Sequence, residues 1–203
     1  MLQNGASLVA FGDSITRGYA VPDGAGWVEL LAGLLPAVQV VNAGGNGNTS
    51  AEGLARIATD VLPHLPALVL VEFGGNDAVH DARAVSVDEF GRNLLTIARQ
   101  VRNTGGEIVL LTFPPIINDW HATHADPYYA PWGGLGPCVE AYRQRTRETA
   151  QRLGCPLFDL AVFLGERIAG GDTERFIQRD GVHLTPEANR LVAAAVVDFL
   201  TSG

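Results

Sequence analysis

The residue types that nucleophilic catalysis requires occur at widely separated points of the chain. Ser14 ends the tripeptide Gly12-Asp13-Ser14, directly after an apolar run, and His183 stands three residues after Asp180. A serine becomes a nucleophile when a histidine takes its proton, and that histidine needs an orienting carboxylate. In an Asp-x-x-His turn the carboxylate can accept the imidazole Nδ1–H, which leaves Nε2 for the serine. Taken singly, each motif fits an ordinary turn or helix cap at least as well.

Two further stretches contain groups that could stabilise an oxyanion. The transition state of acyl transfer places negative charge on an oxygen, and several N–H groups must face it. The stretch NAGGNGNTS at 42–50 offers glycine amides, and GGND at 74–77 offers the side-chain amide of Asn76. The simpler interpretations are a strand-to-helix loop capped by Thr49 or Ser50, and a plain turn. Phosphate binding is disfavoured, because the glycine-rich stretch has neither GKT nor GxGxxG spacing.

Short apolar runs alternate with longer amphipathic ones and predict the elements that must position these residues. The predicted strands are 7–11, 38–42, 67–73, 107–113 and 156–160, and the predicted helices are 26–35, 50–63, 87–103, 138–153 and 186–201. The strands are rich in Val, Ile and Leu, which is typical of strands buried on both faces. This alternation predicts an α/β fold with helices on both faces of a parallel sheet, in a single domain over 1–203.

In such folds ligands bind outside the carboxyl ends of the strands. The candidate motifs follow the first three predicted strands or shortly precede the last helix. We therefore expect them to meet at one end of the sheet, where they would supply a nucleophile, a base, an orienting acid and oxyanion donors.

A long segment, 114–137, follows the fourth predicted strand and should lie over this site. Loops of this length are usually functional or disordered, and its aromatic content favours function. Trp120, Tyr128 and Trp132 are candidate substrate-binding residues that could wall an acyl or sugar pocket, or else form a small satellite core. His121 and His124 form an HxxH pair, but a metal site is disfavoured without a helix to align the ligands.

Together the four motifs resemble the sequence blocks of the SGNH hydrolase family, the GDSL-type esterases and lipases. The matching stretches are GDS at 12–14, NAGGNGNTS at 42–50, GGND at 74–77 and DGVH at 180–183. They occur in the family's order over nearly the whole chain. The resemblance implies a three-layer α/β/α sandwich of flavodoxin-like architecture with a five-stranded, mostly parallel sheet.

The resemblance also implies the role of each residue. Ser14, Asp180 and His183 would form the catalytic triad. The backbone N–H groups of Ser14 and Gly47 and the side chain of Asn76 would form the oxyanion hole, with Gly44 or Gly45 as alternatives to Gly47. No metal and no other cofactor is implied.

The implied activity is hydrolysis of carboxylic esters through an acyl-enzyme, on a small-molecule ester with a short acyl or acetyl group. Alternatives are an acyltransferase, or a thioesterase or lysophospholipase with the same triad, and a binding protein with a relic site. The natural ester and the oligomeric state stay open at this point.

Charge and hydropathy exclude several classes of partner. The net charge is −8, and all 14 basic residues are arginine. Without lysine there is no P-loop lysine and no Schiff-base chemistry. The acidic balance argues against nucleic-acid and anionic-membrane partners. No apolar run is long enough to span a bilayer, and an apolar strand beginning at residue 7 leaves no room for a signal sequence, so we expect a cytoplasmic protein.

Cys138 and Cys155 flank a predicted helix and are expected to be free thiols. A helix between them would hold its ends roughly 24 Å apart. A disulfide requires Cα atoms within about 7 Å.

Overall fold

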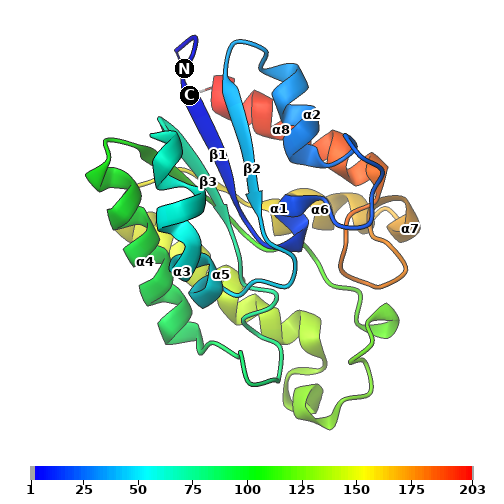
Figure 1. The fold of residues 1–203 in the computed structure, drawn as a ribbon. Coiled ribbons are helices and arrows are strands. Elements are labelled where there is room, and N and C mark those ends of the chain that lie inside the picture. The colour runs from blue at the N-terminus through cyan, green and yellow to red at the C-terminus, as the bar shows by residue number, and fades with distance from the viewer. Residues whose placement is uncertain (1–2, 203) are drawn as a thin grey trace.

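Strand β1 (Ser7–Gly12) lies inside the sheet, with other strands on both sides. In the computed structural model, which describes residues 3–202, one five-stranded sheet has the order β2-β1-β3-β4-β5 (Figure 1). The other strands are β2 (Gln39–Gly44), β3 (Leu68–Glu72), β4 (Glu107–Leu111) and β5 (Leu157–Phe158). All neighbouring strands pair in parallel. Because the strand order reverses at β1, a crevice is expected outside the carboxyl ends of β1 and its neighbours.

Helices cover both faces of the sheet, which confirms the three-layer α/β/α fold (Figure 1). Their bounds are α1 (Ser14–Arg17), α2 (Trp27–Leu34), α3 (Ser50–Asp60), α4 (Val87–Asn103), α5 (Leu135–Leu153), α6 (Leu160–Ile168), α7 (Thr173–Phe176) and α8 (Pro186–Thr201). The pair α2 and α8 packs together in one layer, and α4 packs against both α3 and α5 in the other.

Local sequence signals explain where the long helices begin and which side they bury. The Ser86 side chain accepts from the N–H of Glu89 at the start of α4, and Thr185 does the same for Ala188 at the start of α8. Each cap satisfies a donor that has no partner within the helix. The buried face of α4 includes Phe90 and Leu94, at the spacing of one helical stripe.

Three details differ from the sequence-based prediction. β2 lies at the edge of the sheet, and most of its residues are half-buried rather than buried on both faces. β5 is much shorter than 156–160, because the Asp159 side chain accepts from the N–H of Val162 and caps α6, a helix that was not predicted. Helix α5 begins at Leu135, ahead of the predicted residue 138.

The long segment 114–137 is ordered by short 3₁₀ turns at Asn118–Trp120 and Pro127–Trp132. Its two ends are held by Arg143, a buried side chain of α5. The guanidinium donates to the carbonyls of Phe113 and Pro114, where the segment begins, and of Gly136, where it ends.

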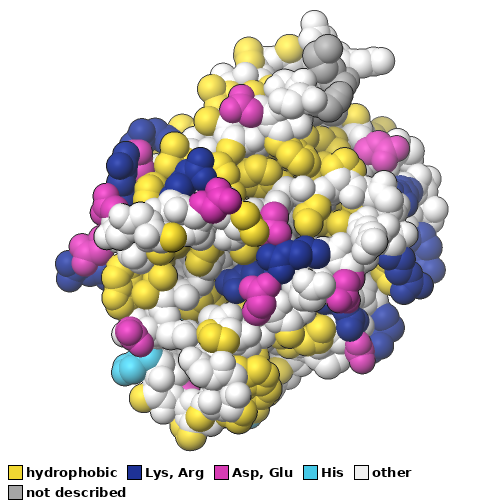
Figure 2. Space-filling model, turned by 180° about the vertical axis from the view of Figure 1, so that it is seen from behind, with side chains coloured by type: hydrophobic (Ala, Val, Ile, Leu, Met, Phe, Trp, Pro, Cys, Tyr) yellow, Lys and Arg dark blue, Asp and Glu magenta, His cyan; other side chains and the backbone are white. Residues whose placement is uncertain are grey.

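On the face shown in Figure 2, arginines are interspersed with carboxylates rather than gathered in one patch. Cys138, which is buried, and Cys155, which is half-buried, are both free. Within residues 3–202 no helix combines the length and the apolar character that crossing a bilayer requires.

Candidate active site

Ser14 stands at the point where β1 turns into α1. Gly12 ends the strand, and Asp13 caps the short helix by accepting from the N–H of Ile15. A Cβ on Gly12 would lie 2.5 Å from the carbonyl oxygen of Glu72 and 2.1 Å from Thr16 Oγ1, so glycine is required for this turn. The turn leaves Ser14 only 7 % exposed, at the carboxyl end of the sheet.

Ser14, His183 and Asp180 form a continuous chain of hydrogen bonds. Ser14 Oγ lies 2.9 Å from His183 Nε2, and His183 Nδ1 lies 2.6 Å from Asp180 Oδ2. The other carboxylate oxygen of Asp180 accepts the backbone N–H groups of Val182 and His183. Partial burial by itself raises the pKa of Asp180, but the hydrogen bonds from the His183 ring and these N–H groups outweigh it and hold the pKa below its ordinary value.

The ring of His183 is also supported from the side. The Tyr19 ring lies with its centroid 4.5 Å from that of the imidazole. Gly181, between the acid and the base, has φ +78°, and its carbonyl accepts the N–H of Ile117 from the long segment. The Asp-x-x-His turn is thus fastened to the segment that covers it.

Of the three candidate glycines in 42–50, only Gly47 lines the cavity beside Ser14. It has φ +71°, a conformation that favours glycine. The N–H groups of Gly44 and Gly45 are already bonded, to Asn42 Oδ1 and to the Gly12 carbonyl.

Asn76 also lines this cavity, but its amide is engaged in the resting protein. Its Nδ2 lies 3.0 Å from Asp13 Oδ2 and 3.1 Å from the carbonyl oxygen of Asn48. Two acceptors for two hydrogens mean that an oxyanion at Ser14 would have to replace one of them.

The cavity at Ser14 has a volume of about 330 Å³. Apolar side chains make up much of its wall: Val79, Phe113, Ile116, Leu135 and Val182. Tyr19, Asn46 and His121 line it as well, and sequence reasoning did not assign them to the site. For His121 a signal existed, because it belongs to the long segment that was expected to cover the site.

The prediction that Trp120, Tyr128 and Trp132 line the substrate pocket needs correction, since none of them borders this cavity. Tyr128 stacks on His80 at 3.7 Å between ring centroids, and Trp132 lies 5.6 Å from Tyr128. Trp120 is half-buried and packs against the core. Tyr128 and Trp132 therefore match the alternative of a small satellite cluster, which His80 joins from outside the segment, whereas Trp120 does not belong to it.

The Nδ1 atoms of His121 and His124 face partners within their own loop. The Nδ1 atom of His121 lies 2.7 Å from Thr123 Oγ1 and accepts the Thr123 N–H, while Nδ1 of His124 lies 3.1 Å from the His121 carbonyl. Among residues 3–202 no three His, Cys, Asp or Glu side chains are grouped so that they could hold a metal ion.

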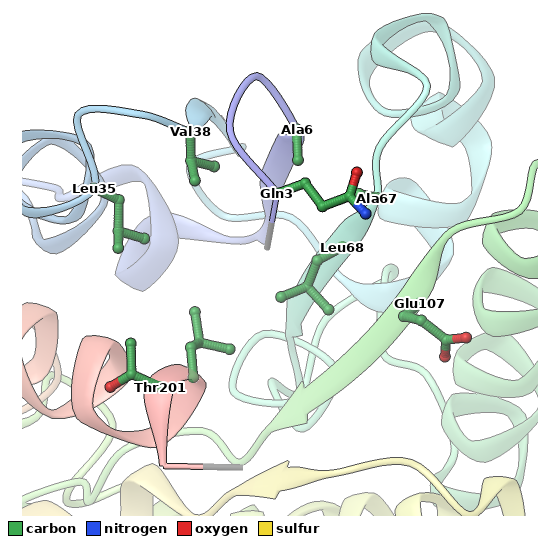
Figure 3. A pocket seen from close by; sticks show the side chains of 9 residues that line it. Gln3, Ala6, Leu35, Val38, Ala67, Leu68, Glu107 and Thr201 are labelled. Atoms are coloured by element: carbon green, nitrogen blue, oxygen red, sulfur yellow. The ribbon is translucent and has the colours of Figure 1, made fainter. Parts of the chain in front are cut away.

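A larger cavity, of about 510 Å³, lies away from these residues (Figure 3). Ala6 and Leu68, at the amino ends of the strands, line it together with Leu35, Val38 and residues near the end of α8. Among residues 3–202, Glu107 is the one titratable side chain that lines this cavity and no serine or histidine borders it, so the smaller cavity at Ser14 is the candidate active site.

The chain is similar to known esterases and acylhydrolases. The sequence matches the model of the GDSL-like lipase/acylhydrolase family over residues 10–191. It is 37 % identical to esterase TesA of Pseudomonas aeruginosa over 52 % of this chain and 53 % of that protein. It is 26 % identical to an arylesterase of Vibrio mimicus over 98 % of this chain and 90 % of that one.

The fold is likewise similar to a solved structure. A lipase/acylhydrolase from Enterococcus faecalis superimposes with a TM-score of 0.79 at 27 % identity, over 97 % of this chain and 96 % of that one.

Proposed function

Because the chain belongs to the GDSL-like lipase/acylhydrolase family, which makes it a carboxylic ester hydrolase, we propose that it cleaves esters of short acyl groups with Ser14 as nucleophile. The observation that carries this proposal is the unbroken hydrogen-bond chain from Ser14 Oγ through His183 to Asp180. A serine next to an oriented imidazole is the arrangement that nucleophilic catalysis needs.

In the first half of the reaction, Ser14 Oγ attacks the carbonyl carbon while His183 Nε2 takes the hydroxyl proton. The bond to the leaving oxygen then breaks, and His183 returns the proton to the departing alcohol. In the second half, water attacks the acyl-enzyme with His183 again as base, which releases the carboxylic acid and restores Ser14. Asp180 holds the imidazole tautomer and stabilises its charged form.

The negative oxygen of each intermediate would be held by three donors. The backbone N–H groups of Ser14 and Gly47 form no hydrogen bond within residues 3–202 and border the cavity. The third donor is Asn76 Nδ2, which would exchange the Asn48 carbonyl for the oxyanion. Such an exchange favours the transition state over the ground state, because it is made only when the charge develops.

The preference for short acyl groups rests on the size of the cavity. Its volume of about 330 Å³ is at the small end of the range for ligand pockets, roughly 300–1,000 Å³. Apolar side chains such as Val79 and Ile116 suit a short hydrocarbon, and the polar rim suits an alcohol or sugar leaving group.

The test is hydrolysis of p-nitrophenyl esters from acetate to palmitate by the wild type, by Ser14→Ala and by Ser202→Ala, an exposed serine control. We expect the wild type and the control to turn over acetate and butyrate best, and Ser14→Ala to be inactive. Equal activity of Ser14→Ala and wild type would contradict the assignment of the nucleophile. Faster turnover of palmitate than of acetate would contradict the short-acyl preference.

A further inference from the structure

Two carboxyl groups that the mechanism does not use are buried beside the nucleophile. Asp13 is 0 % exposed and Glu72 is 1 % exposed. Glu72 ends β3 and lies opposite Gly12 in the register of β1, so its side chain is next to the turn that carries Ser14. An ionised carboxylate in such a place costs several kcal/mol unless it is paired.

No cation neutralises these two groups. Within residues 3–202 neither carboxylate forms an ion pair. Arg56 of α3 approaches this turn, but its guanidinium donates to the carbonyls of Gly12 and Ala43 and pairs with Asp60. The other charged neighbour is a third buried carboxyl, Asp77, whose negative charge adds to the cost.

The hydrogen bonds distinguish the two carboxyl groups. Asp13 accepts at both oxygens, from the Ile15 N–H at 2.8 Å and from Asn76 Nδ2 at 3.0 Å. Glu72 Oε2 accepts from the Thr16 hydroxyl at 3.0 Å, whereas Glu72 Oε1 has no acceptor-type bond at all. Glu72 lies across the β1–β3 register from Gly12, the residue before Asp13, and hydrogen bonding between the two carboxyl groups lowers the pKa of Asp13 and raises that of Glu72. A carboxylate has about four acceptor sites, so Asp13 can accept a further hydrogen, and the buried Glu72 oxygen that lacks a donor is satisfied if it carries a proton.

The pKa shifts of the two carboxyl groups agree with a proton on Glu72. Burial raises the pKa of Asp13 to about 7, although its hydrogen bonds oppose the shift. Burial, followed by the neighbouring charge of Asp13, raises the pKa of Glu72 well above its ordinary value. When two carboxyl groups are this close, one proton is held much more firmly than the other.

We propose that Glu72 is a protonated carboxylic acid that donates its hydrogen to Asp13, and that this pair positions the amide of Asn76 for the oxyanion. Glu72 is thus a positioning residue, and this second part rests on the proposed role of Asn76. The donated hydrogen keeps Asp13 anionic and fixed, so that Asp13 Oδ2 holds one amide hydrogen of Asn76 and directs the other toward the cavity side. Without that donor, Asp13 would take up the proton itself and accept from Asn76 less strongly.

The first test is infrared difference spectroscopy at pH 7 in the Ser14→Ala background. It detects the carbonyl stretch of a protonated carboxylic acid and needs no esterase activity. We expect Glu72→Gln to remove one such band and Glu107→Gln, an exposed control, to leave it. If Glu72→Gln removes no band, the proposal is overturned, whatever the protein hydrolyses.

The second test is kinetic and compares two replacements of similar size in the enzyme with Ser14 intact. Glu72→Gln keeps a neutral donor toward Asp13, so we expect kcat within about threefold of the wild type. Glu72→Met has no donor, and we expect kcat to fall about 10- to 100-fold with KM unchanged, less than loss of a whole oxyanion donor. Circular dichroism checks that both variants are folded.

Two kinetic results would overturn the positioning role. One is an equal loss of kcat in both variants, which would mean that the neutral donor is not what matters. The other is an unchanged kcat in Glu72→Met with only a lower melting temperature, which would make the pair purely structural.

Discussion

At the scale of single residues, Asn76 must exchange a hydrogen bond of the free protein before it can act as the proposed oxyanion donor. In the absence of substrate, its amide donates both hydrogens, one to Asp13 Oδ2 and one to the carbonyl oxygen of Asn48. We expect Asn76→Ala to lower kcat by about 10²–10³-fold, because one oxyanion donor is lost. Steady-state kinetics on p-nitrophenyl acetate test this, with Asn103→Ala on the exposed end of α4 as control. Near-normal kcat in Asn76→Ala would refute the role.

Also at the scale of single residues, we expect His183 and Asp180 to contribute unequally to kcat. In the proposed mechanism His183 takes and returns protons, whereas Asp180 acts only through the imidazole that it orients. We therefore expect His183→Ala to lose more kcat than Asp180→Ala, with both variants folded. The comparison requires single-turnover rates of both variants beside wild type. A larger loss in Asp180→Ala would contradict these assignments.

At the scale of elements, Arg143 is the link between α5 and the long segment. Its buried guanidinium satisfies the carbonyls of Phe113, Pro114 and Gly136 at both ends of that segment. Removing it would leave several buried acceptors unpaired. We expect Arg143→Met to lower the free energy of unfolding by about 3 kcal/mol. Arg143→Lys should not restore it, since an ammonium cannot reproduce the planar fork.

Urea denaturation measures this effect, with Arg152→Met, an exposed position of the same helix, as control. An unfolding midpoint of Arg143→Met equal to that of the control would show that the segment is held by other contacts.

The long segment also contributes Ile116 to the wall of the cavity at Ser14. We expect Ile116→Trp to narrow the cavity and to lower kcat/KM for butyrate and longer esters more than for acetate. Trp132→Ala, outside the cavity, should change the melting temperature but leave the chain-length profile as in the wild type. The p-nitrophenyl ester series compares the two variants, and a changed profile in Trp132→Ala alone would reverse this view of the segment.

At the scale of the whole molecule, buried carboxyl groups at the carboxyl end of the sheet make stability depend on pH. Burial raises the pKa of Asp77 from 3.8 to about 6, even though its carboxylate accepts from Ser50 N and Oγ. The folded state therefore holds this proton more tightly than the unfolded chain. The stability that proton binding by Asp77 contributes is fully present below pH 3.8 and is lost as the pH rises to about 6.

Asp77→Asn removes this titration while it keeps the shape of the side chain. We expect the unfolding free energy of the wild type, relative to that of the variant, to fall by about 2 kcal/mol between pH 4 and pH 6.5. Urea titrations at several pH values measure it. A difference that stays constant over this range would show that Asp77 is ionised throughout.

The sequence by itself determined the local features of this protein. Alternating periodicities predicted the α/β fold and four of the five strands closely, and Asp180 and His183 meet because only two residues of one turn separate them. Caps such as Thr185 marked helix starts. These features depend on near neighbours in the chain, so residue types and spacing are sufficient to predict them. The motif resemblance then placed Ser14 in the same site.

Only the tertiary structure decided which distant side chains meet. Ser14 and His183 are 169 positions apart, and their 2.9 Å contact depends on strand order. Packing of the long segment brought His121, rather than Trp120, to the cavity. The pairing of β1 with β3 places the buried Glu72 opposite Gly12, next to Asp13, and no spacing along the chain encodes this neighbour relation. Burial and non-local contacts determine the electrostatics of the site, and both arise only when the helices pack against the sheet.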